Sequence, residues 1–180
     1  MEKKLYPFKF IPVASRRPWG GSNLVTKYSK AFVECDDEGN EIALGADELI
    51  GESWEIADMG FEDSVLANGW LAGNTISEIM ETYLERVVGE DVYKYFGRQF
   101  PLLVKFLDIN GKLSVQVHPD DAYAAARENG KLGKNEAWLI LETPKGRMSL
   151  RVVGPVRKET QVELSLTDTR NSRSIRKMWI

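Results

Sequence analysis

Residues 113–118 read Leu-Ser-Val-Gln-Val-His and alternate strictly between apolar and polar side chains. Successive side chains of an extended chain point to opposite faces, so this period of two predicts a strand with one apolar face. The opposite face carries Ser114, Gln116 and His118. Pro119 is expected to end the strand, because proline cannot donate to a sheet ladder.

Other segments favour a mainly β fold. Residues 50–57 alternate well enough for a strand, and the acidic stretch 34–48 contains Gly39-Asn40, which predicts a hairpin tip. Residues 100–109 are almost continuously apolar and predict a strand that is buried on both faces. Residues 134–141 predict a further strand on which Lys134, Glu136 and Trp138 share a face. The segment 1–30, rich in proline and glycine, predicts loops and short strands.

Lys105 interrupts the apolar run, and lysine is seldom fully buried without a partner. Two interpretations stay open. Either its ammonium group reaches a pocket, or the strand is an edge strand with Lys105 directed outward.

Two helices are expected beside the strands. One apolar stripe of period 3.6 runs through residues 75–88, with a capping box formed by Thr75 and Glu78. Alanines raise the helix propensity of residues 120–129. Asp120 and Asp121 are expected to serve the N-terminus of that second helix and not catalysis.

Charge and composition exclude several classes of protein. The net charge of −3 in 180 residues gives no general attraction to nucleic acid or to an anionic membrane. No apolar run approaches the roughly 20 residues that span a bilayer, and no signal segment follows the first lysines. Cys35 is the only cysteine and can form no internal disulfide. These features predict a cytoplasmic protein.

The C-terminal segment differs from the rest. Residues 144–180 contain nine lysines and arginines against three acidic residues, whereas residues 1–143 carry a net charge of −9. A basic nucleic-acid-binding tail is one interpretation. A loose terminus and a segment foreign to the fold are the others.

His118 is the only histidine of the chain. A single histidine can be an ordinary polar residue. If the strands lie together, however, the imidazole, the Gln116 amide oxygen and the Glu136 carboxylate could bind one divalent ion, with zinc distances of about 2.0–2.2 Å for the nitrogen and the carboxylate.

Several motifs in sequence order resemble the type I mannose-6-phosphate isomerases. The central one is Phe100-Pro-Leu-Leu-Val-Lys-Phe-Leu-Asp108 followed by Leu113-Ser-Val-Gln-Val-His-Pro-Asp-Asp121. The others are Pro18-Trp-Gly-Gly21, Gly51-Glu-Ser-Trp-Glu55 and Gly133-Lys-Asn-Glu-Ala-Trp138. Together they cover about residues 5–142.

The resemblance implies a cupin-type jelly roll, incomplete here, with added helices near 75–88 and 120–129. It implies one zinc ion and the interconversion of D-mannose 6-phosphate and D-fructose 6-phosphate. The implied site residues are the zinc ligands Gln116, His118 and Glu136, the catalytic Lys134, and the substrate-binding residues Trp19, Lys105 and Ser114. A positive charge near the developing enediol oxyanion would stabilise it.

The chain also departs from the family pattern. The family's second histidine ligand and its phosphate-binding arginine block are missing, and nothing after Glu142 resembles the family. We therefore expect a chain truncated after about residue 142. Residues 1–143 would form the N-terminal part of the catalytic cupin domain, and 144–180 a basic tail that is disordered or frameshifted. Such a chain should be weakly active or inactive and should self-associate through exposed core. The alternatives are a non-catalytic cupin-like module that binds a metal or a sugar, and an interaction protein that uses the tail.

Overall fold

The computed structural model describes residues 4–114, 116, 118–142, 148–153 and 161–166, and only the backbone of the last two stretches. The chain divides into two compact units, Met1–Leu113 and Ser114–Ile180. The expected boundary at residue 143 falls within the segment 143–147, which lies outside the described residues. No helix among the described residues has the length and apolarity needed to cross a membrane.

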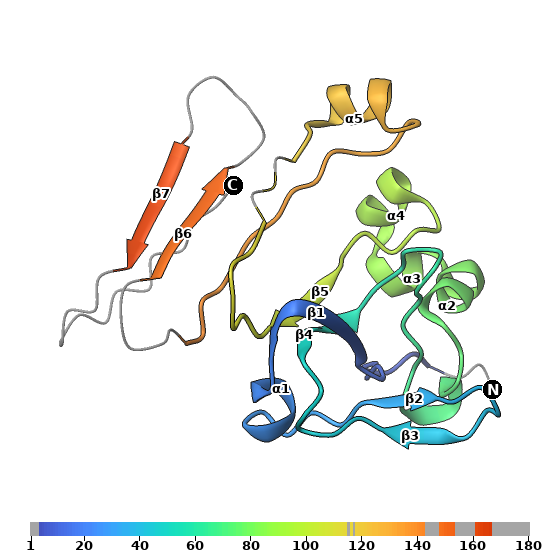
Figure 1. The fold of residues 1–180 in the computed structure, drawn as a ribbon. Coiled ribbons are helices and arrows are strands. Elements are labelled where there is room, and N and C mark those ends of the chain that lie inside the picture. The colour runs from blue at the N-terminus through green and yellow to red at the C-terminus, as the bar shows by residue number, and fades with distance from the viewer. Residues whose placement is uncertain (1–3, 115, 117, 143–147, 154–160, 167–180) are drawn as a thin grey trace. The chain divides into compact units, whose positions relative to one another are not determined.

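An antiparallel sheet organises the first unit (Figure 1). Its three strands are β1 (Val13–Gly21), β4 (Ile50–Ile56) and β5 (Val104–Leu107), in the spatial order β1-β4-β5. The predicted strand at 50–57 is therefore confirmed as β4. The segment 1–30 contains a strand of nine residues, longer than its proline and glycine content predicts. The reason is that β1 pairs with β4 through two irregularities of register, which let the strand continue past Arg16.

The predicted hairpin is also present in the first unit. It consists of β2 (Val33–Cys35) and β3 (Glu41–Ala43), paired antiparallel on either side of Gly39. The backbone of Gly39 has a φ of +85°, a value that glycine adopts without steric cost. Local turn chemistry thus places this hairpin as the sequence predicts.

The long helix expected at 75–88 is divided by the structure. It forms α2 (Ile76–Tyr83) and α3 (Glu85–Val88), because Leu84 adopts a φ of +51°. Tyr83 and Val87, on either side of the break, both pack against the cluster of Leu66, Leu71 and Ile79. The predicted capping box of α2 is confirmed, since Thr75 and Glu78 each accept the backbone N–H of the other.

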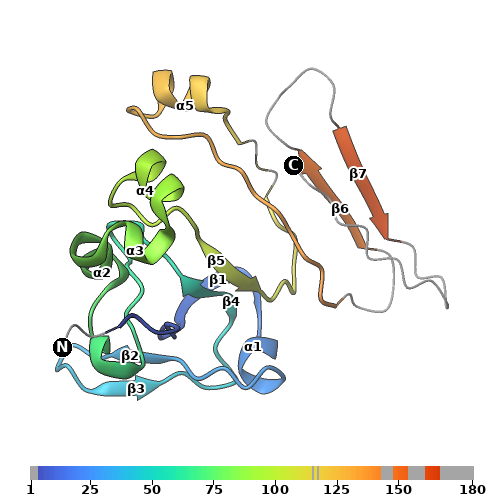
Figure 2. The same ribbon diagram turned by 180° about the vertical axis from the view of Figure 1, so that it is seen from behind.

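Further helices complete the first unit. These are α1 (Asn23–Thr26), the 3₁₀ helix η1 (Gly69–Leu71) and α4 (Glu90–Phe96). Both ribbon views show α2, α3 and α4 grouped together (Figures 1 and 2). A second buried cluster of Leu24, Phe32 and Ile50 joins α1 to β4.

The predicted strand at 100–109 is shorter and more exposed than expected. Only Val104–Leu107 form β5, and Val104 and Phe106 are 47% and 39% exposed. A continuous apolar run does not by itself supply a neighbour to cover it, and β5 lies at the end of the sheet order. The expectation of burial on both faces is therefore wrong for the described residues.

The second unit contains the helix α5 (Asp121–Arg127) and an antiparallel pair, β6 (Met148–Val153) and β7 (Gln161–Leu166). The helix expected at 120–129 is confirmed as α5. Residues 134–141 and the described residues of 113–118 are not strands, whereas residues 115 and 117 lie outside the description. Alternation decides which side chains share a face, but a strand also needs a paired neighbour, and neither segment has a ladder among the described residues.

Candidate functional site

A turn around α5 brings the segment that follows the helix back against the segment that precedes it. Asp120 caps the helix by accepting the backbone N–H of Tyr123, and Asp121 accepts that of Gly133, both at 2.8 Å. The backbone N–H of Lys134 then donates to the carbonyl of Pro119 at 3.2 Å. These bonds attach the Lys134 segment to the residues that adjoin His118.

Gly133 permits this close approach of the two segments. A Cβ atom at this position would lie 2.7 Å from the backbone carbon of Asp120 and 2.8 Å from the carbonyl oxygen of Pro119. Backbone atoms cannot move aside cheaply at such distances. A larger residue would therefore push the two segments apart, and we attribute the glycine of the Gly-Lys-Asn-Glu motif to this contact.

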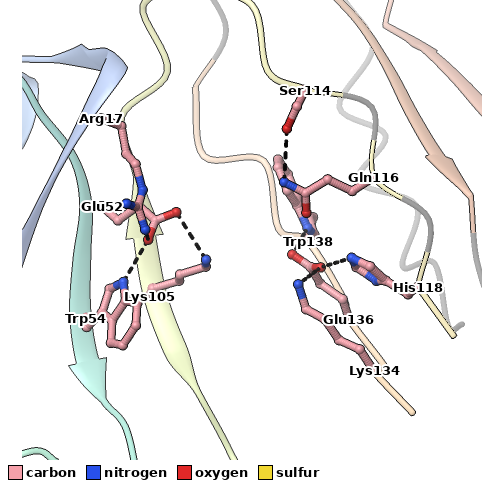
Figure 3. A network of polar contacts seen from close by, with 10 residues as sticks. All are labelled: Arg17, Glu52, Trp54, Lys105, Ser114, Gln116, His118, Lys134, Glu136 and Trp138. Atoms are coloured by element: carbon pink, nitrogen blue, oxygen red, sulfur yellow. Dashed lines mark hydrogen bonds and ion pairs between the residues drawn. The ribbon is translucent and has the colours of Figure 1, made fainter. Parts of the chain in front are cut away.

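The Glu136 carboxylate is the centre of the resulting cluster (Figure 3). It accepts a hydrogen bond from the indole Nε1 of Trp138 at 2.6 Å and pairs with Lys134 Nζ at 2.9 Å. The His118 Nε2 atom lies 3.3 Å from its Oε2 atom. Three residues that the sequence predicts to act together, His118, Lys134 and Glu136, are thus brought together.

The electrostatics of the cluster favour a neutral imidazole beside a carboxylate. Burial, followed by the Lys134 charge, lowers the pKa of His118 more than the Glu136 charge raises it. Burial would raise the pKa of Glu136, but the hydrogen bonds from Lys134 and Trp138 and the charge of Lys134 outweigh it and lower that pKa. Both groups are therefore in the protonation state that a metal ligand requires.

The His118 Nε2 atom is buried and has no hydrogen-bond partner among the described residues. Its contact with Glu136 is close enough for an ion pair but lacks the geometry of a hydrogen bond. Buried polar atoms are nearly always satisfied, so an orphaned one calls for an explanation such as an ion.

Gln116 and Ser114 interact with each other beside this cluster. The Gln116 amide nitrogen donates to the Ser114 hydroxyl at 3.2 Å. This bond uses the nitrogen end of the amide, and Figure 3 shows the oxygen end turned toward Glu136. No group of three histidine, cysteine or acidic side chains in the described part of the chain could hold a metal. A metal at this cluster would need Gln116 as its third protein ligand.

The first unit contains a second carboxylate cluster, centred on Glu52 of β4, a residue of the motif Gly51-Glu-Ser-Trp-Glu55 that was not among the predicted site residues. Its side chain is 7% exposed and pairs with Arg17 and Lys105 at 3.2 Å each. It also accepts a hydrogen bond from Trp54 Nε1 at 2.7 Å. β5 is an edge strand, as one interpretation of Lys105 predicts, but its ammonium group is not directed outward, because it pairs with the buried Glu52.

Trp19 and Lys105 belong to the first unit, and the other predicted site residues belong to the second. The backbone carbonyl of Trp19 accepts the N–H of Asn110 at 2.8 Å. Its ring lies so close to Gly51 that a Cβ atom there would be 2.9 Å from the ring atom Cζ3. Trp19 is therefore held against β4 in the sheet.

The same short pattern occurs in both clusters and could have identified Glu52. Glu52-Ser-Trp54 and Glu136-Ala-Trp138 each place an indole two residues after a carboxylate. In both, the indole donates to the carboxylate and a lysine ammonium pairs with it. A repeated Glu-x-Trp pattern is a sequence signal for such a carboxylate.

Two family models match parts of this chain. A model described as the type I phosphomannose isomerase catalytic domain matches residues 8–146. A second model, described as phosphate propanoyltransferase, matches residues 125–177.

Individual relatives give the same result. The chain is 39% identical over 139 residues to the mannose-6-phosphate isomerase ManA of Bacillus subtilis, covering 77% of this chain and 38% of that protein. It is 37% identical over 137 residues to the probable mannose-6-phosphate isomerase GmuF of Bacillus subtilis, covering 76% and 38%.

A solved structure of mannose 6-phosphate isomerase from Bacillus subtilis matches the fold with a TM-score of 0.55 at 32% identity. The match covers 71% of this chain and 35% of that one. It confirms the expected mainly β, cupin-type fold. The chain thus spans only a little over a third of the length of these relatives.

Proposed function

We propose that this chain, which belongs to the family of type I phosphomannose isomerase catalytic domains, carries part of an aldose–ketose isomerase site. The substrate would be mannose 6-phosphate, which the names of its relatives contain. D-Fructose 6-phosphate would be the other sugar phosphate, as the resemblance to the family implies. The single observation that carries the proposal is the cluster of His118, Lys134 and Glu136, with its orphaned imidazole nitrogen.

The residues present suit a zinc ion. Gln116, His118 and Glu136 would be its protein ligands, because a neutral imidazole, an ionised carboxylate and an amide oxygen are all available donors. When bound, the ion would supply Lewis-acid polarisation of the substrate oxygens. An amide ligand leaves such an ion with more positive charge than a second carboxylate would.

The protein side chains would contribute binding and charge. Lys134 is held by Glu136 at 2.9 Å and is about half exposed, so its ammonium group can both stay in place and meet a substrate oxyanion. Ser114 would orient the Gln116 amide through their hydrogen bond. The resemblance to the family implies substrate binding by Trp19, Lys105 and Ser114, and we keep these three roles as a proposal.

A metal-binding experiment tests this site without depending on turnover. Dialysis against zinc followed by metal analysis should give about one zinc per chain. His118→Ala and Gln116→Ala should each lower the zinc affinity by at least tenfold. Gln99→Ala is the matched control, because Gln99 is an exposed glutamine in the first unit. Equal zinc binding by all the variants would refute the assignment of the ligands.

A second candidate function is a metal- or sugar-binding module without turnover. The observation that favours it is the length of the match, which covers only 35–38% of the relatives compared above. A coupled assay for fructose 6-phosphate, with zinc added, separates the two. We expect weak turnover from the chain alone that is lost when zinc is removed, whereas no turnover with zinc bound would favour the binding module. Turnover at the rate of ManA would exclude the binding-module alternative.

We also infer that residues 1–143 and 144–180 differ in origin. A second family matches residues 125–177 and overlaps the isomerase match over residues 125–146, so it supports a change of family toward the C-terminus without placing a junction at residue 144. A changed reading frame would produce a sequence unrelated to any family. Sequencing the DNA on both sides of codon 144 distinguishes a junction of two coding segments from a changed reading frame. An isomerase-like continuation in another frame would favour the changed reading frame.

We also propose a cytoplasmic location and self-association of the isolated chain. Cytoplasmic location is consistent with the single exposed thiol of Cys35, which would be at risk of oxidation elsewhere. Self-association of the isolated chain is expected from its exposed apolar side chains, and sedimentation velocity measures it.

A further inference from the structure

The Glu136 carboxylate uses its two oxygens differently. Its Oε1 atom accepts the hydrogen bond from the indole Nε1 of Trp138 at 2.6 Å. Its Oε2 atom lies 2.9 Å from Lys134 Nζ and 3.3 Å from His118 Nε2. Figure 3 shows the dashed lines to Lys134 and His118 meeting at this second oxygen. One oxygen is therefore committed to the indole, and the other faces the orphaned imidazole nitrogen.

The spacing of the motif produces the contact between the indole and the carboxylate. Residues that are two positions apart in an extended chain project to the same side. Burial alternates accordingly in this segment, with Glu136 and Trp138 partly buried and Ala137 and Leu139 exposed. The indole has a single N–H donor and no acceptor, so Trp138 can bind a carboxylate oxygen only by donating to it. The Glu-x-Trp pattern thus attaches the rigid indole ring to one particular oxygen.

Glu52 shows the same indole bond on a carboxylate whose two oxygens are both occupied. Trp54 and Arg17 donate to its Oε2 atom at 2.7 and 3.2 Å, and Lys105 donates to its Oε1 atom at 3.2 Å. Glu136 differs, because its Oε2 atom faces a buried imidazole nitrogen that has no hydrogen-bond partner in the described part of the chain. The indole completes an ion-pair network at Glu52, whereas at Glu136 it determines which oxygen is left for a ligand.

We propose that Trp138 is a positioning residue that sets the metal preference of this cluster. The proposal rests on the function proposed above, because it takes His118 and Glu136 as metal ligands. The indole holds the Oε1 atom, so Glu136 presents a single oxygen to an ion. A four-coordinate tetrahedral zinc site needs only one donor atom from each ligand. Manganese prefers an octahedral shell of oxygens and gains more from a carboxylate that offers both of its oxygens.

An isostere without the N–H group tests the proposal in the full chain. Benzothienylalanine, introduced at position 138 by amber suppression, keeps the bicyclic ring and replaces the N–H group with sulfur, so the packing stays and the donor is lost. Dissociation constants for zinc and for manganese are then measured by competition with a chelating dye. We expect the zinc affinity to fall by about tenfold or more, and the manganese affinity to stay the same or to rise. Trp138→Phe should give the same pattern and provides a second variant if the isostere disturbs folding.

The matched control is the same isostere at Trp54, which removes the indole bond to Glu52 and should leave both metal affinities unchanged. The proposal is overturned if the affinities for zinc and manganese fall equally at position 138, because the ring would then only support the local fold. It is also overturned if the replacement of Trp54 weakens zinc binding as much. Zinc binding by the unaltered chain that the isostere at position 138 leaves unchanged overturns this proposal alone. An unaltered chain that binds no zinc overturns the ligand assignment together with it.

Discussion

The buried carboxylate of Glu52 gives a sharp prediction for the stability of the first unit. Glu52→Gln preserves the shape of the side chain and removes its charge. The change weakens the charged hydrogen bonds from Arg17, Lys105 and Trp54, which lie 2.7–3.2 Å away. Hydrogen bonds to charged groups contribute about 1.5–3 kcal/mol each.

The full sum of three bonds would overestimate the effect. Arg17 and Lys105 are 41% and 23% exposed, so water can solvate both cations once the charge is lost. Glutamine also keeps one oxygen acceptor. We therefore expect a loss comparable to one charged hydrogen bond, about 2 kcal/mol in the free energy of unfolding.

Urea denaturation followed by far-ultraviolet circular dichroism measures this loss at pH 7. Glu34→Gln is the matched control, because Glu34 pairs with Arg16 at the surface and should change stability by less than about 0.5 kcal/mol. Equal effects of the two substitutions would refute the reasoning that burial makes Glu52 different.

The pH dependence of the Glu52 contribution has a definite sign. Burial would raise the pKa of Glu52, but Trp54, Lys105 and Arg17 outweigh it and hold the pKa below its ordinary value. A carboxylate with a lowered folded-state pKa stabilises the fold above its unfolded pKa, roughly 4.3. The stabilisation is lost as the pH falls through the folded-state value. The difference between wild type and Glu52→Gln should thus be constant from pH 6 to 8 and shrink below about pH 4.

Two further predictions concern local structure in the first unit. Thr75→Ala removes the capping box of α2 and should lower stability by about 1 kcal/mol in thermal unfolding, whereas an unchanged midpoint would show that the cap contributes little. Gly69→Ala should lower stability by about 1–3 kcal/mol in urea, since Gly69 has a φ of +71° and a Cβ atom there would overlap the Tyr6 ring. Gly73→Ala shares the positive φ but meets no neighbour within 4 Å, so a smaller loss is expected there, and equal losses would mean that the Tyr6 contact is unimportant.

Local signals in the sequence were the most reliable guide to this fold. The capping box of α2, the Gly39 turn and the Asp120 cap each depend on residues within a few positions of one another. The break at Leu84 could not be predicted, because the apolar stripe continues across it. Tyr83 and Val87, on either side of the break, both pack against Leu66 and Leu71, so the shared apolar face gives no sign of the break.

Long-range neighbours explain what sequence reasoning missed. Glu52 meets Arg17 at a separation of 35 residues and Lys105 at 53, and no local pattern encodes such contacts. Likewise, the apolar run around β5 predicts a buried strand without revealing whether a neighbour exists. The approach of His118 to Glu136 agrees with the motif order, and it depends physically on the absence of a side chain at Gly133.

The paired Glu-x-Trp geometry gives each carboxylate an optical probe of its own. The emission of an indole depends on the charge and hydrogen bonding around its N–H group. Trp54 donates to Glu52, and Trp138 donates to Glu136. In a variant that keeps only Trp54, with the remaining tryptophans replaced by phenylalanine, the fluorescence would follow protonation of Glu52. In a variant that keeps only Trp138, it would follow ion loading at Glu136. Neither measurement needs an added dye.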